Sequence, residues 1–338
     1  MKIAVDAMGG DNGLKVTVKG SIDAIKEYDV NIVLIGKEEL IKEELNKYDY
    51  PKNKIDIVNA RDIITNDDEP AMAIRKKKDS SIVVGLNLLK NKEVDGFISA
   101  GSTGAVLSGG LLIVKRIKGI ERPALGTVFP TKKGISLLLD IGANADCKAK
   151  YLQQFAIMGS IYAQKILNMS KPRVGLVNIG SERGKGNELM KETYDLLENT
   201  DNISFCGNIE GRDIPYGNYD VLVCDGFSGN IILKLTEGLA MSIFDMLKDV
   251  FMKSFMTKIG AAILKPSLKE FKKTLDYSEY GGAPLLGIKG AVIKAHGSSD
   301  EFAIKNAIRQ AKTFIENKII EKIEEDINLL GGNNDKDS

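Results

Sequence analysis

Short apolar runs alternate with longer amphipathic stretches along most of the chain. The apolar runs predict strands at 2–6, 31–35, 55–58, 94–98, 124–129, 135–140, 173–178, 203–206, 220–224, 284–287 and 291–295. The stretches between them repeat apolar residues at helical spacing and predict helices near 14–28, 37–47, 80–91, 103–116, 148–167, 187–198, 229–256 and 300–326. Because continuously apolar strands alternate with helices, we predict an α/β fold whose mostly parallel sheet is covered by helices on both faces.

Glycine-rich turns follow nearly every predicted strand. The six turns are DAMGGD (6–11), SAGSTGA (99–105), DIGANAD (140–146), NIGSERGKGNE (178–188), DGFSGN (225–230) and HGSSD (296–300). Open α/β sheets bind ligands at the carboxyl ends of their strands, so we expect these turns to converge on one cleft. The alternative is that each glycine only allows a tight turn. This alternative is reasonable for any single turn, but it is less able to explain six turns that are all rich in Ser, Asn and Asp.

None of these turns matches a nucleotide-binding motif. In a P-loop that ended on Lys185, the first glycine would fall at Ile179, and Gly186 replaces the Ser or Thr that binds Mg²⁺. No turn reads G-x-G-x-x-G with an acidic residue about 20 positions further on. We therefore expect no nucleotide and no other cofactor.

Composition removes further classes of function. The chain of 338 residues has 47 basic and 46 acidic residues, a net charge of +1 that does not favour nucleic acid. Its single histidine, His296, excludes a His-rich metal site, and Cys147, Cys206 and Cys224 lack metal-binding spacing and fit a reducing cytosol. We expect no metal. The first residues, MKIAVDAMGGD, predict a strand and turn rather than a signal peptide, and no apolar run reaches the roughly 18–20 residues that span a bilayer.

The turns instead offer backbone N–H groups, hydroxyls, amides and cations that suit phosphate. The residues that we expect to bind it are Asp6, Gly9, Gly10, Asp11, Ser102, Thr103, Asn144, Arg183, Ser228, Gly229 and His296.

A phosphate dianion is itself a nucleophile and needs no Ser-His-Asp relay, but it needs positioning and a stabiliser for the oxyanion formed at an attacked carbonyl. We predict that Lys185 and Asn230 are the catalytic residues that supply this stabilisation. The alternatives are a solvated lysine at a helix start and an asparagine that caps a helix.

Two other residues have reactive chemistry. Cys147 could accept the acyl group as a thiolate, although a buried, inert cysteine is the more ordinary interpretation. His296 could be a general acid, or it could only bind an anion or cap the last helix.

The segment 247–275 is both basic and amphipathic. Apolar residues recur at helical spacing from Leu247 to Leu275, and Pro266 predicts a break that would make the segment a helical hairpin. Seven lysines against Asp249 and Glu270 favour binding to a membrane surface. The alternative is packing on the core or on a second subunit. The residues that we expect to enter the membrane are Phe255, Ile259, Ile263, Leu264 and Leu268.

Several motifs together resemble one known family. KIAVDAMGGD, SAGSTGA, ERPAL, LLLDIGANADCK, GKGNE, DGFSGN and GGAPLLGIKG followed by HGSSD are similar to the acyl-ACP:phosphate acyltransferases of bacterial glycerolipid synthesis. The resemblance runs from about residue 1 to 328. It implies a three-layer α/β/α fold related to phosphotransacetylases and isocitrate-type dehydrogenases. It also implies transfer of a fatty acyl group from acyl carrier protein to inorganic phosphate.

The resemblance implies a setting for this reaction. The acyl phosphate would pass to a membrane glycerol-3-phosphate acyltransferase, and the protein would be a cytoplasmic homodimer, peripherally associated with the inner face of the cell membrane. The functional lysine and asparagine of the family match Lys185 and Asn230. Two departures are Ser102, where many relatives have Asn, and the run Ser181-Glu182-Arg183, where relatives often carry acidic residues. The second departure makes Arg183 an additional anion ligand.

The domain organisation follows from these patterns. We expect residues 1–330 to form one catalytic domain, which could divide into two lobes around a cleft, and the polar tail 331–338 to be disordered. A basic stretch should dock the acidic carrier protein; it consists of Lys115, Arg116, Lys118, Arg122, Lys132 and Lys133.

Three alternative functions stay open. One is a phosphotransacetylase that acts on a short acyl-CoA. Another is a metal- and NAD-dependent hydroxyacid dehydrogenase, for which the sequence lacks clustered aspartates and a nucleotide loop. The third is a non-catalytic scaffold for lipid synthesis at the membrane, which would not need phosphate-binding turns.

Overall fold

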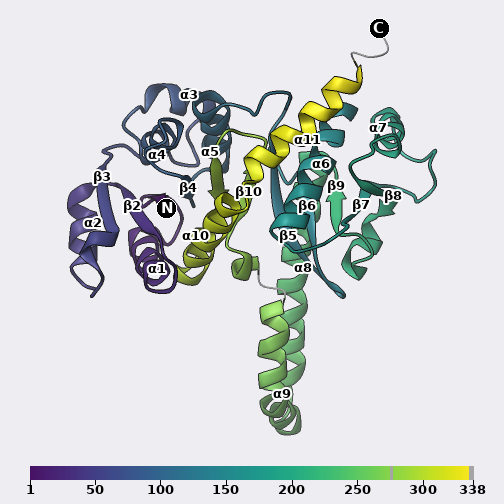
Figure 1. Ribbon diagram of the computed structural model, residues 1–338. Coiled ribbons are helices and arrows are strands. Elements are labelled where there is room, and N and C mark those ends of the chain that lie inside the picture. Colours follow the sequence, from purple (N-terminus) through teal and green to yellow (C-terminus); the bar gives the residue numbers. More distant parts are fainter. Residues whose placement is uncertain (275–276, 335–338) are drawn as a thin grey trace.

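A computed structural model describes residues 1–274 and 277–334 and has one large sheet with helices on both faces (Figure 1). The sheet has eleven strands in the order β3-β2-β1-β4-β11-β10-β5-β6-β9-β7-β8. All eleven predicted strands are present: β1 (Lys2–Asp6), β2 (Asn31–Gly36), β3 (Ile55–Asn59), β4 (Gly96–Ser99), β5 (Ala124–Thr131), β6 (Gly134–Leu139), β7 (Arg173–Asn178), β8 (Ser204–Glu210), β9 (Val221–Val223), β10 (Ala283–Leu286) and β11 (Ala291–Lys294).

The helices follow the prediction with four differences. They are α1 (Gly13–Glu27), α2 (Glu38–Leu45), α3 (Pro70–Lys76), α4 (Ser81–Lys90), α5 (Thr103–Gly109), α6 (Ala149–Lys165), α7 (Glu188–Glu198), α8 (Gly226–Met252), α9 (Phe255–Thr274), α10 (Glu301–Glu316) and α11 (Ile319–Asn334). Short 3₁₀ turns lie at Lys52–Lys54, Gly211–Tyr216 and Tyr277–Tyr280, and a π-helical turn, Gly110–Val114, continues α5.

The four differences have local causes. The short helix α3 was not expected; it begins at Pro70, and the Glu69 carboxylate accepts hydrogen bonds from its first N–H groups. The predicted helix 300–326 is two helices, because Lys318 takes a left-handed backbone conformation with φ of 50°. The expected break at Pro266 was wrong: α8 ends at Met252, and α9 continues through Pro266. Finally, α11 extends to Asn334, into the tail expected to be disordered, and residues 335–338 lie outside the described residues.

The strand directions divide the sheet into two halves. Strands β3, β2, β1, β4 and β11 are parallel to one another, and so are β6, β9, β7 and β8. Between them, β10 is antiparallel to β11 and β5, and β5 is antiparallel to β6. The strands of the two halves therefore run in opposite directions, and the halves form two lobes (Figure 1).

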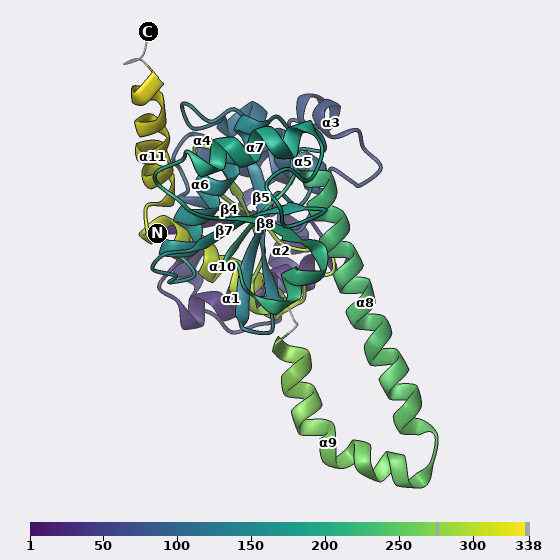
Figure 2. The same ribbon diagram turned by 90° about the vertical axis from the view of Figure 1, so that its right-hand side faces the viewer.

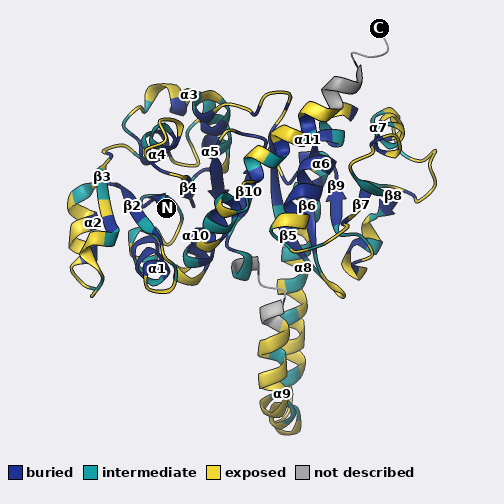
Figure 3. Cartoon of the chain, in the orientation of Figure 1, coloured by how far each residue is buried: buried dark blue, intermediate teal, exposed yellow. Residues whose placement is uncertain are grey.

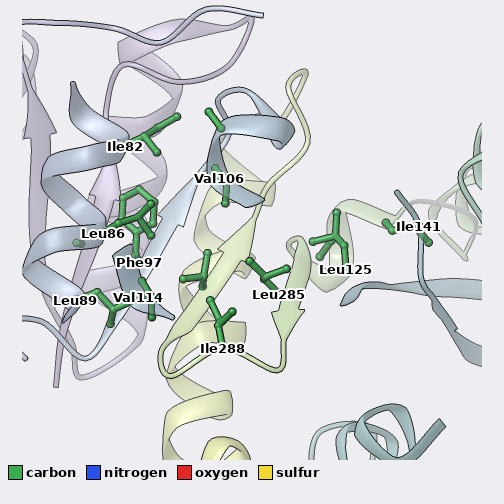
Figure 4. Packing of buried hydrophobic residues seen from close by; sticks show 14 of the residues in the cluster. Ile82, Leu86, Leu89, Phe97, Val106, Val114, Leu125, Ile141, Leu285 and Ile288 are labelled. Carbon is green, nitrogen blue, oxygen red and sulfur yellow. The ribbon is translucent and has the colours of Figure 1, made fainter. Parts of the chain in front are cut away.

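The core is continuous between the two lobes. Alternate residues of β1 face opposite layers, with Ile3 and Val5 toward α1 and α10, and Ala4 toward the α4 side. On the α4 side, the apolar cluster extends from Ile82 and other α4 residues across β10 to Leu125 and Ile141 in the second lobe (Figure 4). The apolar packing is therefore shared by the two halves of the sheet.

A helical arm, residues 239–274, projects away from both lobes. It consists of the outer part of α8 and all of α9, which turns back along α8 (Figure 2). With 27 residues, α8 is about 40 Å long. Figure 2 also shows that α9 changes direction along its length, and Pro266 within it lacks the N–H of a regular helical hydrogen bond. Leu275, the last residue of the predicted hairpin, lies outside the described residues.

Candidate functional site

A cleft of about 1090 Å³ lies between the two lobes, and five of the six predicted turns contribute to its lining. The first lobe contributes the turns after β1, β4 and β11, and the second contributes those after β6 and β9. The carboxyl ends of strands from both lobes therefore face one space, although the two sets of strands run in opposite directions. The sixth turn, 178–188, is not part of the lining.

In the first lobe, the turn after β1 packs closely on the turn after β4. A Cβ atom on Gly9 would lie 2.5 Å from the backbone nitrogen of Gly101, so only glycine fits there. Gly10 has φ of +92° and lies against Ala100 and Gly297. Asp6 is buried and accepts hydrogen bonds from Ser99 Oγ (2.7 Å) and Met8 N–H (3.0 Å). Burial raises the pKa of the Asp6 carboxyl, which holds these turns together rather than facing the cleft.

Six predicted ligands from this lobe line the cleft: Gly9, Gly10, Asp11, Ser102, Thr103 and His296. Ser102 Oγ accepts a hydrogen bond from Ala105 N–H (3.4 Å), so this hydroxyl also caps α5. The Nδ1 atom of His296 accepts a hydrogen bond from Ser298 N–H (3.2 Å), which leaves the proton of the neutral ring on Nε2.

In the second lobe, a buried carboxylate organises the turn after β6. Asp140 accepts hydrogen bonds from four backbone N–H groups and from the Asn144 amide at 2.9 Å. Asn144 also donates to the carbonyl of Pro123 (2.7 Å). The Asn144 amide is therefore occupied within its own turn, and it does not line the cleft.

The start of α8 packs directly on this turn. A Cβ atom on Gly229 would lie 1.9 Å from the Asp140 carbonyl oxygen, which fixes the position of the next residue, Asn230. Ser228 Oγ donates to the helix-capping carboxylate of Asp225 (3.0 Å). Among the described residues no partner hydrogen-bonds the side chain of Asn230, which lines the cleft opposite Gly142. Of these predicted residues, Asn230 has the side chain that is available to a ligand.

Lys185 lies outside the cleft lining, on the exposed loop between β7 and α7. Strand β7 is two positions from β6 in the sheet, a lateral separation of about 10 Å. Its ammonium group has no hydrogen bond or ion pair to any part of the chain that the structure describes. Asn230 follows β9, the neighbour of β7 in the sheet, so the two residues lie on adjacent turns, and of the two only Asn230 is part of the cleft lining.

Arg183 has a local structural role in place of the predicted phosphate contact. Its guanidinium pairs with Asp195 and Glu198 on α7, both at 2.8 Å, and lies over the Tyr194 ring. These contacts fasten the 178–188 loop to α7 and occupy the charge that we had expected to bind an anion.

The sequence analysis missed a buried lysine at the end of β11. Lys294 is 7% exposed and lines the cleft. Its Nζ donates to the backbone carbonyls of Ala295 and Ala100, the latter at 3.5 Å. Desolvation lowers the pKa of Lys294 to about 8, against the opposing influence of Asp6 and Asp11. The signal in the sequence was its position between an apolar strand and the HGSSD turn.

Cys147 is poorly suited to nucleophilic attack. It is half-buried, and desolvation, with the nearby charges of Asp140 and Asp225, raises the pKa of its thiol to about 12. The thiolate, which is the reactive form, is scarce at neutral pH. The structure therefore favours the inert interpretation of this residue.

One wall of the cleft is apolar and leads to the helical arm. Leu233, Ala240, Met241 and Phe244 of α8 line the cleft at the base of the arm. Met241 is 70% exposed, so the apolar surface continues from the cleft onto the outside of α8. The cleft thus joins a polar end made of glycine turns to an apolar side wall.

The basic stretch predicted to dock the carrier does not form one patch. The eight residues of β5, about 26 Å long, separate Arg122 from Lys132. The carbonyl of Lys115 accepts a hydrogen bond from Lys289 N–H (2.8 Å), so Lys115 lies beside the start of β11. Lys294, at the other end of β11, faces the cleft, so this part of the stretch lies away from the cleft.

Comparisons with known proteins agree with this architecture. The family model described as "Fatty acid synthesis protein" matches residues 1–322. The chain is 59% identical to the phosphate acyltransferase of Alkaliphilus oremlandii (strain OhILAs), over 98% of each chain. It is 57% identical to the phosphate acyltransferase of Clostridium novyi (strain NT), over 97% of this chain and 98% of that one.

Solved structures with low sequence identity share the fold. A phosphotransacetylase from Streptococcus pyogenes aligns with a TM-score of 0.64 at 20% identity, covering 95% of this chain and 94% of that one. A 4-hydroxythreonine-4-phosphate dehydrogenase from Klebsiella pneumoniae aligns with a TM-score of 0.53 at 11% identity, covering 93% and 99%. The predicted α/β fold class and its relation to these two kinds of fold are confirmed.

Proposed function

The chain belongs to the family of fatty acid synthesis proteins whose curated relatives are named phosphate acyltransferases, and on this premise we propose that it transfers a fatty acyl group from acyl carrier protein to inorganic phosphate. It is an acyltransferase enzyme. The acyl-carrier donor and the acyl phosphate product are the proposed part. No helix among the described residues is long and apolar enough to cross a membrane.

The observation that carries the proposal is the two-sided cleft. Glycine turns with backbone N–H groups and hydroxyls suit a phosphate, whereas the α8 wall with Leu233, Met241 and Phe244 suits a long hydrocarbon chain. A short acyl group would have no use for the apolar wall. This is the reason to favour a fatty acyl donor over the short acyl-CoA of a phosphotransacetylase.

The reaction needs no protein nucleophile. The second pKa of phosphate esters is about 6, and much of a phosphate is accordingly doubly charged at neutral pH. One oxygen of the dianion attacks the thioester carbon, the C–S bond breaks, and the carrier thiolate leaves. Acylation makes the remaining P–OH more acidic, and its proton ends on the thiol. The products are an acyl phosphate and free carrier.

Two residues of the chain are proposed to stabilise the oxyanion. The unpaired amide of Asn230 lines the cleft and can donate to the carbonyl oxygen. The free ammonium of Lys185 lies on a loop beside the cleft, where Gly184 has open space and Gly186 has φ of +91°. We propose that this loop brings Lys185 over the bound thioester, since the two residues start from neighbouring turns.

The arm is proposed to serve assembly and location. Large apolar side chains of the α8 part of the arm, such as Leu239 and Met246, are exposed in the single chain and suit a second copy in a homodimer. The exposed Phe255 and Ile263 of α9, with the neighbouring lysines, suit the surface of an anionic bilayer. A cytoplasmic enzyme held there would deliver its product to a membrane glycerol-3-phosphate acyltransferase.

Mass spectrometry of the products after mixing protein, acyl carrier protein loaded with a fatty acyl group, and phosphate tests the proposal. We expect acyl phosphate and free carrier, and we expect release of the carrier thiol to require phosphate. Equal thiol release without phosphate would indicate a thioesterase. Acyl phosphate formed from acetyl-CoA but not from the acyl carrier would establish the phosphotransacetylase alternative.

A further inference from the structure

Lys294 is a buried cation that the proposed mechanism does not use. It ends β11 in register with Ser99 of β4 and Ala283 of β10, and its side chain is buried. Its Nζ contacts two backbone carbonyls, and among the described residues no carboxylate lies within ion-pair distance of it. A buried charge without a counter-ion costs stability, so a protein gains from keeping it only where the charge is used.

A second polar group in the same segment also lacks a partner. Ser299, five residues after Lys294, is 8% exposed and lines the cleft. Its Oγ is buried and makes no hydrogen bond to any residue that the structure describes, although its backbone N–H donates to the His296 carbonyl (3.1 Å) and its carbonyl accepts from the Asn12 amide (3.1 Å). A buried hydroxyl without a partner is unusual and calls for a ligand.

Lys294 and Ser299 line the cleft together with Gly10 and Gly297 of the surrounding turns. Gly10 lies against Ala100, whose carbonyl contacts Lys294, and against the carbonyl of Gly297, two residues before Ser299. A side chain at position 10 would crowd Ala100 and the Gly297 carbonyl, and its φ of +92° also favours glycine. A buried ammonium, an orphan hydroxyl and a glycine where three turns meet fit a tetrahedral oxyanion.

We propose that Lys294 and Ser299 form the subsite that binds inorganic phosphate, an inference that rests on the proposed function. The ammonium balances the charge of the nucleophile, and the hydroxyl donates to one of its oxygens. This assignment separates two tasks: Lys294 holds the phosphate, and Asn230 with Lys185 stabilises the oxyanion on the acyl carbon. The phosphate dianion then has Lys294 as its cation, and the oxyanion on the acyl carbon has Lys185.

Calorimetric titration with inorganic phosphate, without any acyl donor, tests the subsite directly. We expect Lys294→Met to weaken phosphate binding by about 10- to 100-fold, because it removes a charge-assisted hydrogen bond, and Ser299→Ala to weaken it by about 3- to 10-fold. The matched control is Lys289→Met, an exposed lysine beyond the other end of β11, which should bind phosphate as the wild type does.

Folding does not confound this test. Replacing a buried, unpaired charge by an apolar side chain of similar length should raise the melting temperature of the phosphate-free protein. A variant that is more stable and yet binds phosphate weakly indicates a binding residue. Unchanged phosphate affinity in Lys294→Met would overturn the inference.

The pH dependence of kcat/KM for phosphate gives an independent test. The charged groups that face Lys294 are Asp6 and Asp11 from the β1 turn, His296 and Asp300 from the turn after β11, and Lys234 and Glu237 from α8. With its pKa lowered to about 8, Lys294 is charged below that pH and loses its charge above it. Wild-type kcat/KM should therefore fall above pH 8, and Lys294→Arg, which stays charged, should lack this fall. Equal slopes in both proteins would contradict the assignment.

These results separate the inference from the proposed function. If the wild type turns over acyl carrier with phosphate and Lys294→Met keeps the wild-type KM for phosphate, this inference alone is wrong. If the wild type neither binds phosphate nor makes acyl phosphate, the proposed function is wrong as well.

Discussion

In the sheet, apolar side chains are buried almost completely, whereas in the helical arm they face solvent. The central residues of β1, β4 and β6 have no exposed surface, but α8 buries only Gly226 and Gly229 along its whole length (Figure 3). Both regions are rich in large apolar residues, so composition does not distinguish them. The difference teaches that the lobes are complete within one chain, whereas the arm is shaped for contacts outside it.

The same comparison separates the region that we expect to carry out the reaction, the cleft, from the region that we expect to position the protein in the cell, the arm. Every turn that lines the cleft is anchored by buried contacts, such as those of Asp140, and can hold a substrate in a fixed geometry. The arm contributes only its base, including Met241 and Phe244, to the cleft. We therefore expect substitutions in the cleft to remove turnover and substitutions in the outer arm to leave turnover intact.

The largest effects should come from the two proposed oxyanion donors. Losing one such donor typically lowers kcat by about 10²–10³-fold, and we expect at least this loss for Asn230→Ala and for Lys185→Ala. Lys185→Arg should recover little, because a planar guanidinium does not replace a compact charge. Acyl phosphate formation by each purified variant is the measurement, with circular dichroism and gel filtration as controls. Near-normal turnover in Lys185→Ala would remove the 178–188 loop from the site.

A smaller but still large effect should follow from a single methyl group at the base of α8. Gly229→Ala places a Cβ 1.9 Å from the Asp140 carbonyl oxygen, so α8 must shift and carry Asn230 with it. Overpacking of this kind costs about 1–3 kcal/mol of unfolding free energy, and we expect turnover to fall by about tenfold or more.

The matched control for this change lies further along the same helix. Gly238 has open space around its Cα, so Gly238→Ala should be neutral or stabilise the helix by up to about 1 kcal/mol, without loss of turnover. Thermal unfolding and turnover of both variants decide the matter. Equal behaviour of the two alanines would show that the contact with Asp140 does not position Asn230.

The strands could be predicted from the sequence because strands buried on both faces are continuously apolar, as in KIAVD and DVLVC. The short helix α3 could not, since PAMAIRK is too short to display a helical period. The strand order was also beyond reach. The antiparallel pairings of β10 with β5 and of β5 with β6 set the two lobes against each other, and the order β6-β9-β7 places Lys185 two strands from β6. No local sequence pattern encodes either feature.

The candidate site was predictable in its turns but not in its side-chain partners. Glycine spacing identified five turns that line the cleft. It could not show that the side chains of Asn144 and Arg183 already have partners. Asn144 donates to Asp140 only once the turn has folded, and Arg183 pairs with Asp195 only once α7 packs beside the loop. Lys294 was missed because a lysine at the end of a strand is normally solvated, whereas here the folded chain buries it in the lining of the cleft.

In the arm, charge reversal of the apolar tip should remove membrane binding and spare turnover. Phe255 and Ile263 are 78% and 73% exposed, so Phe255→Glu with Ile263→Glu should not disturb packing. Each new carboxylate opposes both insertion and the attraction of nearby lysines, which is worth about 1 kcal/mol each near an anionic surface. We expect flotation with anionic liposomes to fall at least tenfold.

The control for this prediction has the same added charge at polar positions. Ser242 and Ser267 are exposed, so Ser242→Glu with Ser267→Glu changes the net charge equally without touching the apolar tip. It should lose less binding than the tip variant. Undiminished flotation of a folded tip variant would instead favour packing of the arm on a second copy of the chain.

The smallest effect should come from substitution of Cys147, the residue that would carry the acyl group in a mechanism with a covalent acyl-enzyme intermediate. Its thiol has a pKa raised to about 12 by burial and by nearby carboxylates, so it stays protonated through the whole neutral range and contributes no pH-dependent limb to turnover between pH 6 and 9. Because the thiolate is the reactive form, an acyl-enzyme route through this residue is disfavoured at neutral pH. Cys147→Ser should therefore keep turnover within about twofold, as should Cys206→Ser, a change at an exposed cysteine.

Mass spectrometry of the wild type with acyl donor and no phosphate should detect no acylated protein. An acyl adduct on Cys147, with turnover lost in the serine variant, would replace direct attack by phosphate with a two-step mechanism.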